Sequence, residues 1–346
     1  MANRLLKGIG VFLIAAVLVL LAGGATVYYL NRPSPGIPAE GTVFKVLRGE
    51  NLSTIAERLE LEGLIRSRLL LLAFSRLNGT ETAFKNGYFR ILPGDTMIDV
   101  HNLLVAGYQE QVKITIPEGW TLKQIARYLE DKEIATSEEF LQAVSSPSLL
   151  DQFGIPAENL EGYLFPDTYY FPRGYPAYGV VEEMVENLFR RLADIAPEAL
   201  QWDRQRLHRR IILASIVERE YRKAEEAPLI ASVFYNRLDY NIGLESCATL
   251  EYIITDIQNK PHPEFLSAED KRIDSPYNTY KWAGLPPGPI SSPGEVALNA
   301  AFHPADTEFY YFVLKNPQTG EHYFSEGLQE HNWAKYYFLK RVGSGG

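Results

Sequence analysis

The sequence predicts an α+β protein behind an apolar N-terminal helix, and three observations lead to that class. A strand-like run, a tight turn and a helix-like run follow one another three times between residues 44 and 129. Helical patterns interrupted by proline and glycine fill most of residues 136–238, and an aromatic hairpin pattern occupies residues 309–324. The first thirty residues contain one long apolar stretch.

That apolar stretch runs from Ile9 to Leu30 without a charged residue. At about 1.5 Å per residue these positions make a helix of about 33 Å, enough to cross a bilayer. Arg4 and Lys7 precede it, so the positive-inside rule places the first residues in the cytoplasm and the rest of the chain outside. We therefore expect residues 1–30 to form a cytoplasmic tip and a single-pass anchor.

A cleaved signal peptide is the alternative reading of the same segment. Small residues at 22–25 offer a cleavage site, but the apolar stretch continues beyond them to Leu30, which is longer than a usual signal-peptide core. An uncleaved anchor is favoured. Residues 31–40 are rich in proline and predict a stiff linker that lifts the first folded unit off the membrane.

Composition bounds the kind of protein that follows. A chain of 346 residues with 46% hydrophobic and 22% charged residues is globular and can bury a core. The formal net charge of −9, without a concentrated basic face in the sequence, argues against nucleic acid as a partner. Cys247 is the only cysteine, and the six histidines show no HExxH motif or close pair, so we expect neither a disulfide nor a metal or cofactor.

The three strand-turn-helix copies occupy residues 44–59, 88–100 and 112–129. Each has a glycine at the turn, and Asn51, Asp95 or Trp120-Thr121 stands where a helix cap belongs. The first and third copies resemble the LysM module, which recognises glycans containing N-acetylglucosamine. We expect LysM-like α+β units over residues 41–135, with a purely structural role as the alternative.

The stretch from Ile211 to Glu220 predicts the end of a buried helix, because an almost wholly apolar run leads straight into carboxylates. Glu218 shares a helix face with small and apolar neighbours, and loss of water around a carboxyl raises its pKa toward neutrality. Glu220 lies about 200° around the helix and cannot face the same point. The alternative is that either glutamate only pairs with Arg219, Arg222 or Lys223.

Two aromatic and proline-rich stretches suggest glycan-binding loops. Residues 160–169 hold Tyr163 and Asp167 beside a glycine and a proline, which suits either a loop flanking a cleft or a core-filling turn. Residues 275–294 contain many prolines, which predicts a rigid, exposed loop holding polar groups such as Asn278 and Ser291. His331, at the start of the predicted closing helix, is either a site residue or a hydrogen-bonded buried histidine.

The motifs together resemble one family. The order LEGYLFPDTY (160–169), ASIVERE (214–220), SVFYNRL (232–238), YNTY (277–280), GLPPGPIS (284–291) and EHN (330–332) is similar to the MltG (YceG-like) family of endolytic murein transglycosylases. The resemblance implies a catalytic domain over residues 136–346 and Glu218 as catalytic acid/base. Carried over as candidate substrate-binding residues are Glu220, Asn236, Arg237, Thr249, Tyr277, Asn278, Ser291, Tyr163, Asp167 and His331.

One segment departs from the family pattern. Where the family usually reads Asp-Pro before Thr-Val, this chain has Cys247-Ala248 before Thr249-Leu250, so a role for that aspartate is absent or moved. Cys247 is a small, nearly neutral substitute rather than an evident nucleophile.

The resemblance implies a membrane-bound lytic transglycosylase that works without a cofactor on the extracytoplasmic, periplasmic side. It would cleave the β-1,4 bond between MurNAc and GlcNAc and leave 1,6-anhydroMurNAc ends, with peptidoglycan strands as substrate and peptidoglycan synthases as candidate partners. Ordinary glycosidases need two carboxylates, whereas this reaction needs one. A non-catalytic peptidoglycan-binding scaffold and a muramidase that uses water remain the alternatives.

Overall fold

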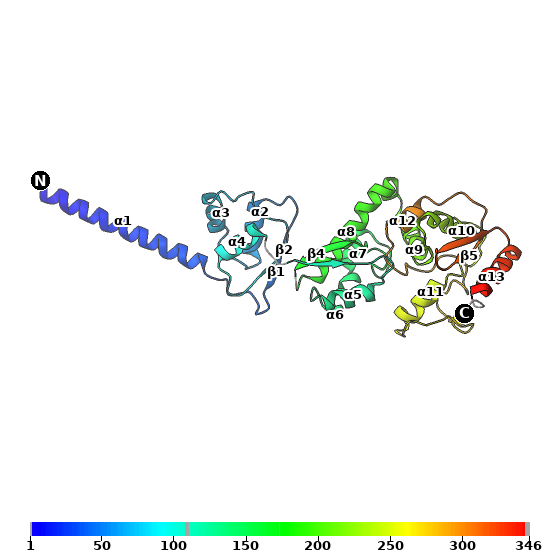
Figure 1. The fold of residues 1–346 in the computed structure, drawn as a ribbon. Helices are drawn as coiled ribbons and strands as arrows, with labels where there is room; N and C mark the ends of the chain where they lie inside the picture. Colours follow the sequence, from blue (N-terminus) through cyan, green and yellow to red (C-terminus); the bar gives the residue numbers. More distant parts are fainter. Residues whose placement is uncertain (1, 108–110, 173, 343–346) are drawn as a thin grey trace. The chain divides into compact units, whose positions relative to one another are not determined.

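The computed structural model describes residues 2–107, 111–172 and 174–342, and the chain divides into two compact units, Met1–Glu110 and Gln111–Gly346 (Figure 1). Both units combine helices with short antiparallel strand pairs. This mixture confirms the predicted α+β class.

The first unit is built around a two-stranded sheet covered by helices. β1 and β2 pair antiparallel, with Thr42 opposite Ile91 and Val46 opposite Gly87. Apolar side chains from the strands and helices fill one core, in which Phe44, Ile55 and Leu71 are fully buried. Its elements are α1 (Ala2–Asn31), β1 (Thr42–Val46), α2 (Leu52–Leu61), α3 (Arg68–Leu77), β2 (Gly87–Ile91) and α4 (Met97–Ala106).

The predicted caps of the first two copies differ in outcome. Asn51 caps α2, since its side-chain oxygen accepts a hydrogen bond from the Thr54 amide at 3.0 Å. The cap of α4 is Thr96 rather than Asp95, because the capping side chain must stand directly before Met97 to reach the amide of Asp99. Asp95 instead accepts from the Leu92 amide at 2.7 Å and closes the turn.

The end of α1 is tied to the rest of its own unit. The Asn31 side chain accepts a hydrogen bond from the Ile98 amide at 3.1 Å, and the Arg66 guanidinium lies 4.9 Å from the centre of the Tyr29 ring. No helix within the described part of the chain combines the length and the apolar character of a membrane span. Of the predicted anchor, residues 9–13, 15 and 16 lie outside the side chains that the structure describes.

The second unit contains two strand pairs and most of the helices. β3 pairs antiparallel with β4, and β5 with β6 forms the predicted C-terminal hairpin. Its main elements are β3 (Gln111–Thr115), α5 (Leu122–Asp131), α6 (Ser137–Val144), α7 (Pro147–Phe153), β4 (Thr168–Pro172), α8 (Ala177–Ile195), α9 (Arg204–Glu220), α10 (Ala227–Asp239), α11 (Cys247–Tyr252), α12 (Glu295–Phe302), β5 (Tyr311–Asn316), β6 (Glu321–Ser325) and α13 (Leu328–Val342).

The division of the chain falls at residue 110, whereas we predicted a boundary at residue 135. The third strand-turn-helix copy belongs with the second unit, because β3 pairs with β4 and the apolar face of α5 enters that unit's core. Ile114, Ile125 and Leu129 are fully buried there beside Tyr163 and Leu188. The pairing of β3 with β4, a strand more than fifty residues later in the sequence, places the third copy in the second unit.

α9 is the helix around which the second unit packs, in contact with α10, α11 and α12. Asp203 caps its start by accepting from the Arg206 amide at 2.9 Å. All seven residues from 211 to 217 are buried, which confirms the helix predicted there as a buried one. The helix ends at Glu220, so its last turn brings charged side chains out of a dry core.

The predicted exposed loop of residues 275–294 is exposed at positions such as 281–283, but its end, residues 288–294, is buried. The Ser215 hydroxyl accepts from the Ile290 amide at 3.0 Å, and the Ser291 hydroxyl donates to the Ser215 carbonyl at 3.1 Å. Residues 288–294 are buried against α9 by these bonds. A proline-rich segment lacks regular backbone pairing of its own, and here a helix supplies the partners instead.

Candidate active site

Glu218 lies half-buried in the last turn of α9, against the end of the proline-rich loop. Its Oε2 accepts a hydrogen bond from the Gly294 amide at 2.9 Å. This amide belongs to the residue just before α12 and fixes the direction of the carboxyl group. The structure thus positions Glu218 between the end of one helix and the start of another.

A second carboxylate, Glu118, reaches the same place from the turn between β3 and α5. The Gly119 amide donates to the Ser292 carbonyl at 2.8 Å, and the Ser292 amide donates to the Trp120 carbonyl at 2.8 Å, so the two loops are paired. A Cβ atom added to Gly294 would lie 1.9 Å from Oε1 of Glu118. Only a glycine at this position lets both carboxylates lie against the loop.

Tyr221 lies near both carboxylates. It follows α9 directly, and burial together with the charges of Glu218 and Glu118 raises the pKa of its hydroxyl. The hydroxyl therefore keeps its proton and is a donor beside the two acids.

Burial raises the pKa of Glu218 to about 8. The hydrogen bond from Gly294 opposes this rise, the negative charge of Glu118 adds to it, and Arg219 and Tyr221 oppose it. Near neutral pH the side chain is therefore mostly protonated. A carboxyl group in this state can donate a proton to a leaving group.

Neither Glu118 nor Tyr221 was among the residues predicted from the sequence. The repeat itself contained a signal for Glu118. In the first two copies the acidic residue follows the glycine. Glu50 and Asp95 each accept a hydrogen bond from a backbone amide of their own turn. In the third copy the acid precedes Gly119. Its carboxylate is thereby free of the turn and available to the neighbouring loop.

A buried acid, Glu161, supports the turn that carries Glu118. Its carboxylate accepts from the amide of Leu122, the first residue of α5, at 3.2 Å and from the Tyr252 hydroxyl at 3.3 Å. Burial, followed by the charge of Asp256, raises the pKa of Glu161 to about 8. Thr121 extends this support with a hydrogen bond of 2.6 Å to Asp256.

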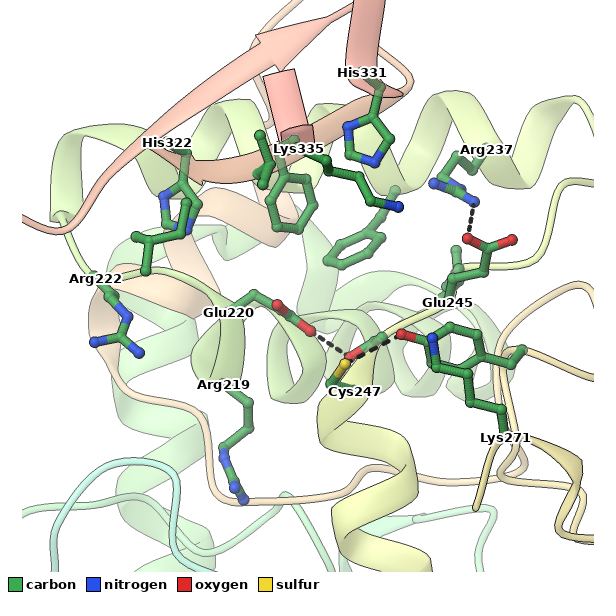
Figure 2. A pocket seen from close by; sticks show the side chains of 17 residues that line it. Arg219, Glu220, Arg222, Arg237, Glu245, Cys247, Lys271, His322, His331 and Lys335 are labelled. Atoms are coloured by element: carbon green, nitrogen blue, oxygen red, sulfur yellow. Dashed lines mark hydrogen bonds and ion pairs between the residues drawn. The ribbon is translucent and has the colours of Figure 1, made fainter. Parts of the chain in front are cut away.

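Glu220 faces away from Glu218, as the helix phase predicted. It accepts a hydrogen bond of 2.5 Å from the Ser246 hydroxyl, and burial raises its pKa. It lies at the wall of a separate cavity of about 390 Å³ (Figure 2). Arg219, between the two glutamates, also lines this cavity and forms an ion pair with Glu251 at 2.9 Å.

Arg237 and His331, two of the predicted binding residues, line the cavity with Glu220 (Figure 2). Arg237 is buried, donates to the Gly243 carbonyl at 2.8 Å and pairs with Glu245 at 3.3 Å. The His331 ring stacks on Tyr311, and its Nδ1 is buried without a hydrogen-bond partner among the described residues. Burial and the nearby charge of Lys335 lower the pKa of His331.

Four other predicted residues hold loops together. The Asn236 amide donates to the carbonyls of Thr307 and Phe309, and the Asn278 amide donates to those of Lys271 and Ile273. The buried Thr249 hydroxyl donates to the Ser246 carbonyl. Ser291 binds α9 as described above. These contacts give each of the four side chains a structural task.

Tyr163, Asp167 and Tyr277 are also engaged within the fold. Tyr163 is buried in the core and its hydroxyl bonds to His208 Nδ1 at 2.8 Å, which corresponds to the core-filling alternative. Although burial disfavours its charge, hydrogen bonds from Thr168, Asn187 and Arg191 hold the pKa of Asp167 below its usual value. The Tyr277 ring packs on the Tyr252 ring, with the ring centres 5.2 Å apart.

Cys247 lies at the edge of the cavity, with its sulfur 3.1 Å from the Tyr280 hydroxyl. It begins α11 and is exposed. Across residues 2–107, 111–172 and 174–342, no three histidine, cysteine, aspartate or glutamate side chains gather as metal ligands would.

These features define a YceG-like protein. A sequence model of the YceG-like family matches residues 44–336, and the chain belongs to that family. It is 29% identical over 342 residues to the endolytic murein transglycosylase of Bacillus subtilis, covering 92% of this chain and 91% of the relative.

Two further comparisons agree with this membership. The endolytic murein transglycosylase of Streptococcus pneumoniae is 30% identical over 314 residues, and the match covers 82% of this chain and 56% of that longer protein. The crystal structure of a YceG-like protein from Listeria monocytogenes superposes with a TM-score of 0.56 at 29% identity, over 86% of this chain and 99% of that one.

Proposed function

We propose that this protein is an endolytic murein transglycosylase in which Glu218 is the catalytic acid and base. Relatives with that name align with most of this chain, which supports peptidoglycan as the substrate. The observation that carries the role of Glu218 is a half-buried carboxyl group with a pKa of about 8, held by the Gly294 amide and flanked by a second acid. Such a group is protonated when the substrate arrives.

In the proposed reaction Glu218 donates its proton to the oxygen of the bond between MurNAc and GlcNAc. As that bond breaks, the GlcNAc hydroxyl leaves and positive charge develops at the anomeric carbon of MurNAc. The C6 hydroxyl of the same MurNAc then attacks that carbon, and the Glu218 carboxylate accepts the hydroxyl proton. The products are a 1,6-anhydroMurNAc end and a free GlcNAc hydroxyl, and no water is consumed.

Glu118 has an electrostatic role in the proposed reaction. Its negative charge stabilises the proton on Glu218 before the reaction, and afterwards it stabilises the positive charge that develops on the sugar. Tyr221 offers a protonated hydroxyl beside both carboxyl groups. Glu118 is thus a positioning residue for Glu218.

The experiment is digestion of purified sacculi followed by mass spectrometry of the products. The wild-type protein should release muropeptides with 1,6-anhydro ends, and Glu218→Gln should release none while still binding glycan. Glu225→Gln, an exposed glutamate in the turn before α10, is the matched control and should remain active. Near-normal activity of Glu218→Gln would remove Glu218 from the proposed role.

The same spectra separate the alternatives. A muramidase that uses water would give reducing MurNAc ends, because water would take the place of the C6 hydroxyl. A non-catalytic scaffold would bind sacculi and give no soluble product from either the wild type or the variant.

We also propose that the protein acts at the outer face of the cytoplasmic membrane. The support is the uncharged run from Ile9 to Leu30 behind Arg4 and Lys7, together with large apolar side chains exposed along α1 between Ile14 and Tyr29. The LysM-like units predicted over residues 41–135 are candidate glycan contacts by resemblance alone. Peptidoglycan synthases are candidate partners, and co-purification of the full chain from solubilised membranes would test both the location and the partners.

A further inference from the structure

The cavity beside Glu220 carries an excess of positive charge that the proposed reaction does not use. Five basic side chains line it, Arg219, Arg222, Arg237, Lys271 and Lys335, against two carboxylates, Glu220 and Glu245. They come from the end of α9 and the segment that follows it, from α10, from the turn before residue 273 and from α13, so separate parts of the fold converge on one space (Figure 2).

Ion pairs account for only part of this charge. Arg219 pairs with Glu251, and Arg237 pairs with Glu245. Glu220 accepts a hydrogen bond from Ser246 and forms no ion pair with these cations. Within the described part of the chain, Arg222, Lys271 and Lys335 have no carboxylate within ion-pair distance. Among the described residues, the cavity wall therefore holds three cations without an ion-pair partner, one of which, Lys271, lies over the Tyr280 ring at 4.5 Å.

The cavity also holds polar groups of the kind that orient a ligand. The buried Nδ1 of His331 lacks a hydrogen-bond partner among the described residues, and Lys335 extends from the same face of α13 toward the middle of the space (Figure 2). A volume of about 390 Å³ falls within the range of small-ligand pockets and exceeds what one carboxylate needs. A short acidic peptide fits both the size and the charge.

We propose that this cavity binds a carboxylate-bearing peptide attached to the glycan strand. The proposal deepens the proposed function, because murein strands carry short peptides with free carboxylates on the lactyl groups of MurNAc. Arg219 lies between Glu218 and the cavity. A Cβ atom added to Gly119 would lie 3.4 Å from the Cδ of Arg219 and 3.7 Å from the Cγ of Glu218. A sugar held at Glu218 thus lies next to Arg219, whose side chain lines the cavity.

Binding can be measured without any cleavage. The probe is a muramyl tripeptide with free carboxylates, which has a single sugar and no bond to cut, titrated calorimetrically into the full chain. The comparison ligand is the same muramyl tripeptide with all its carboxyl groups amidated. We expect the amidated ligand to bind about tenfold more weakly or worse, because the charge-assisted hydrogen bonds are lost.

The variants test the location of the site. Lys271→Gln combined with Lys335→Gln should weaken binding of the free tripeptide by about tenfold and reduce its dependence on salt. Lys113→Gln, an exposed lysine on β3 outside the cavity, is the matched control and should bind as the wild type does. Unchanged thermal unfolding of the double variant would show that it is folded.

Three results would overturn the proposal: equal binding of the free and amidated ligands, unchanged binding by the double variant, or displacement of the tripeptide by inorganic phosphate at equal concentration. The last result would assign the cavity to a phosphate group instead. Because the probe is not cleaved, these outcomes are independent of whether Glu218 is catalytic. Loss of anhydro products with intact tripeptide binding would refute only the proposed reaction.

Discussion

The raised pKa of Glu218 makes the stability of the protein depend on pH, and Glu218→Gln should remove that dependence. The folded protein holds a proton on Glu218 up to about pH 8, whereas the unfolded chain releases it near pH 4.5. Between these values the folded state binds more protons than the unfolded state, so its stability falls as the pH rises. Glutamine keeps the shape of the protonated acid and cannot titrate.

The magnitude follows from the two pKa values. A group that is protonated only in the folded state costs at most about 1.36 kcal/mol of stability per pH unit. Between pH 5 and pH 8 this amounts to about 4 kcal/mol, and the partial exposure of Glu218 to water reduces it to about 2–4 kcal/mol. Glu218→Gln should therefore be about as stable as the wild type at pH 5 and more stable than it at pH 8.

Urea unfolding of both proteins at several pH values, followed by far-ultraviolet circular dichroism, measures this difference. The buried acids Glu161 and Glu220 contribute equally to both proteins and cancel in the comparison. Glu225→Gln should show no such trend. A stability difference between Glu218→Gln and the wild type that stays flat from pH 5 to pH 8 would refute the assignment of a raised pKa to Glu218.

Three further substitutions test the surroundings of Glu218. Glu118→Gln removes a negative charge that raises the pKa of Glu218, so the alkaline fall of kcat/KM should move to lower pH, and an unmoved profile would separate the two acids. Gly294→Ala, at an unstrained φ of −83°, should reduce kcat about tenfold or more with little change in Tm, because the added methyl group displaces Glu118. Gly162→Ala should cost about 2–4 kcal/mol of unfolding free energy, since φ is +79° and the new Cβ would lie 2.4 Å from Pro289; a Tm within a degree of the wild type would contradict this packing.

The sequence predicted elements with strong local signals. The run from Ile211 to Val217 is almost wholly apolar, and such a run can only be satisfied inside a core, so the buried helix and the exit of Glu218 from it followed directly. Asn51 was recognisable as a cap for the same reason, because its bond to Thr54 spans three residues. Helix phase alone also placed Glu220 on the opposite face from Glu218.

What the sequence did not reveal depends on contacts between distant segments. Glu118 reaches Glu218 only because Gly119 and Ser292 pair across 173 positions of chain, and no local pattern specifies that pairing. The proline-rich loop looked exposed because its backbone lacks regular partners, yet Ser215 provides one from inside a helix. The basic cavity draws its lysines from segments that are separated by 64 residues, Lys271 and Lys335.

The last turn of α9 serves both proposed tasks from opposite sides. Glu218 and Glu220 are two residues apart, about 3 Å along the helix axis, and a rigid turn of backbone keeps that spacing constant. A glycan strand whose peptide occupies the cavity would then always place the same glycosidic bond, counted from that peptide, next to Glu218. The choice of bond along a polymer of repeating sugars would be fixed by helix geometry, with no moving part required.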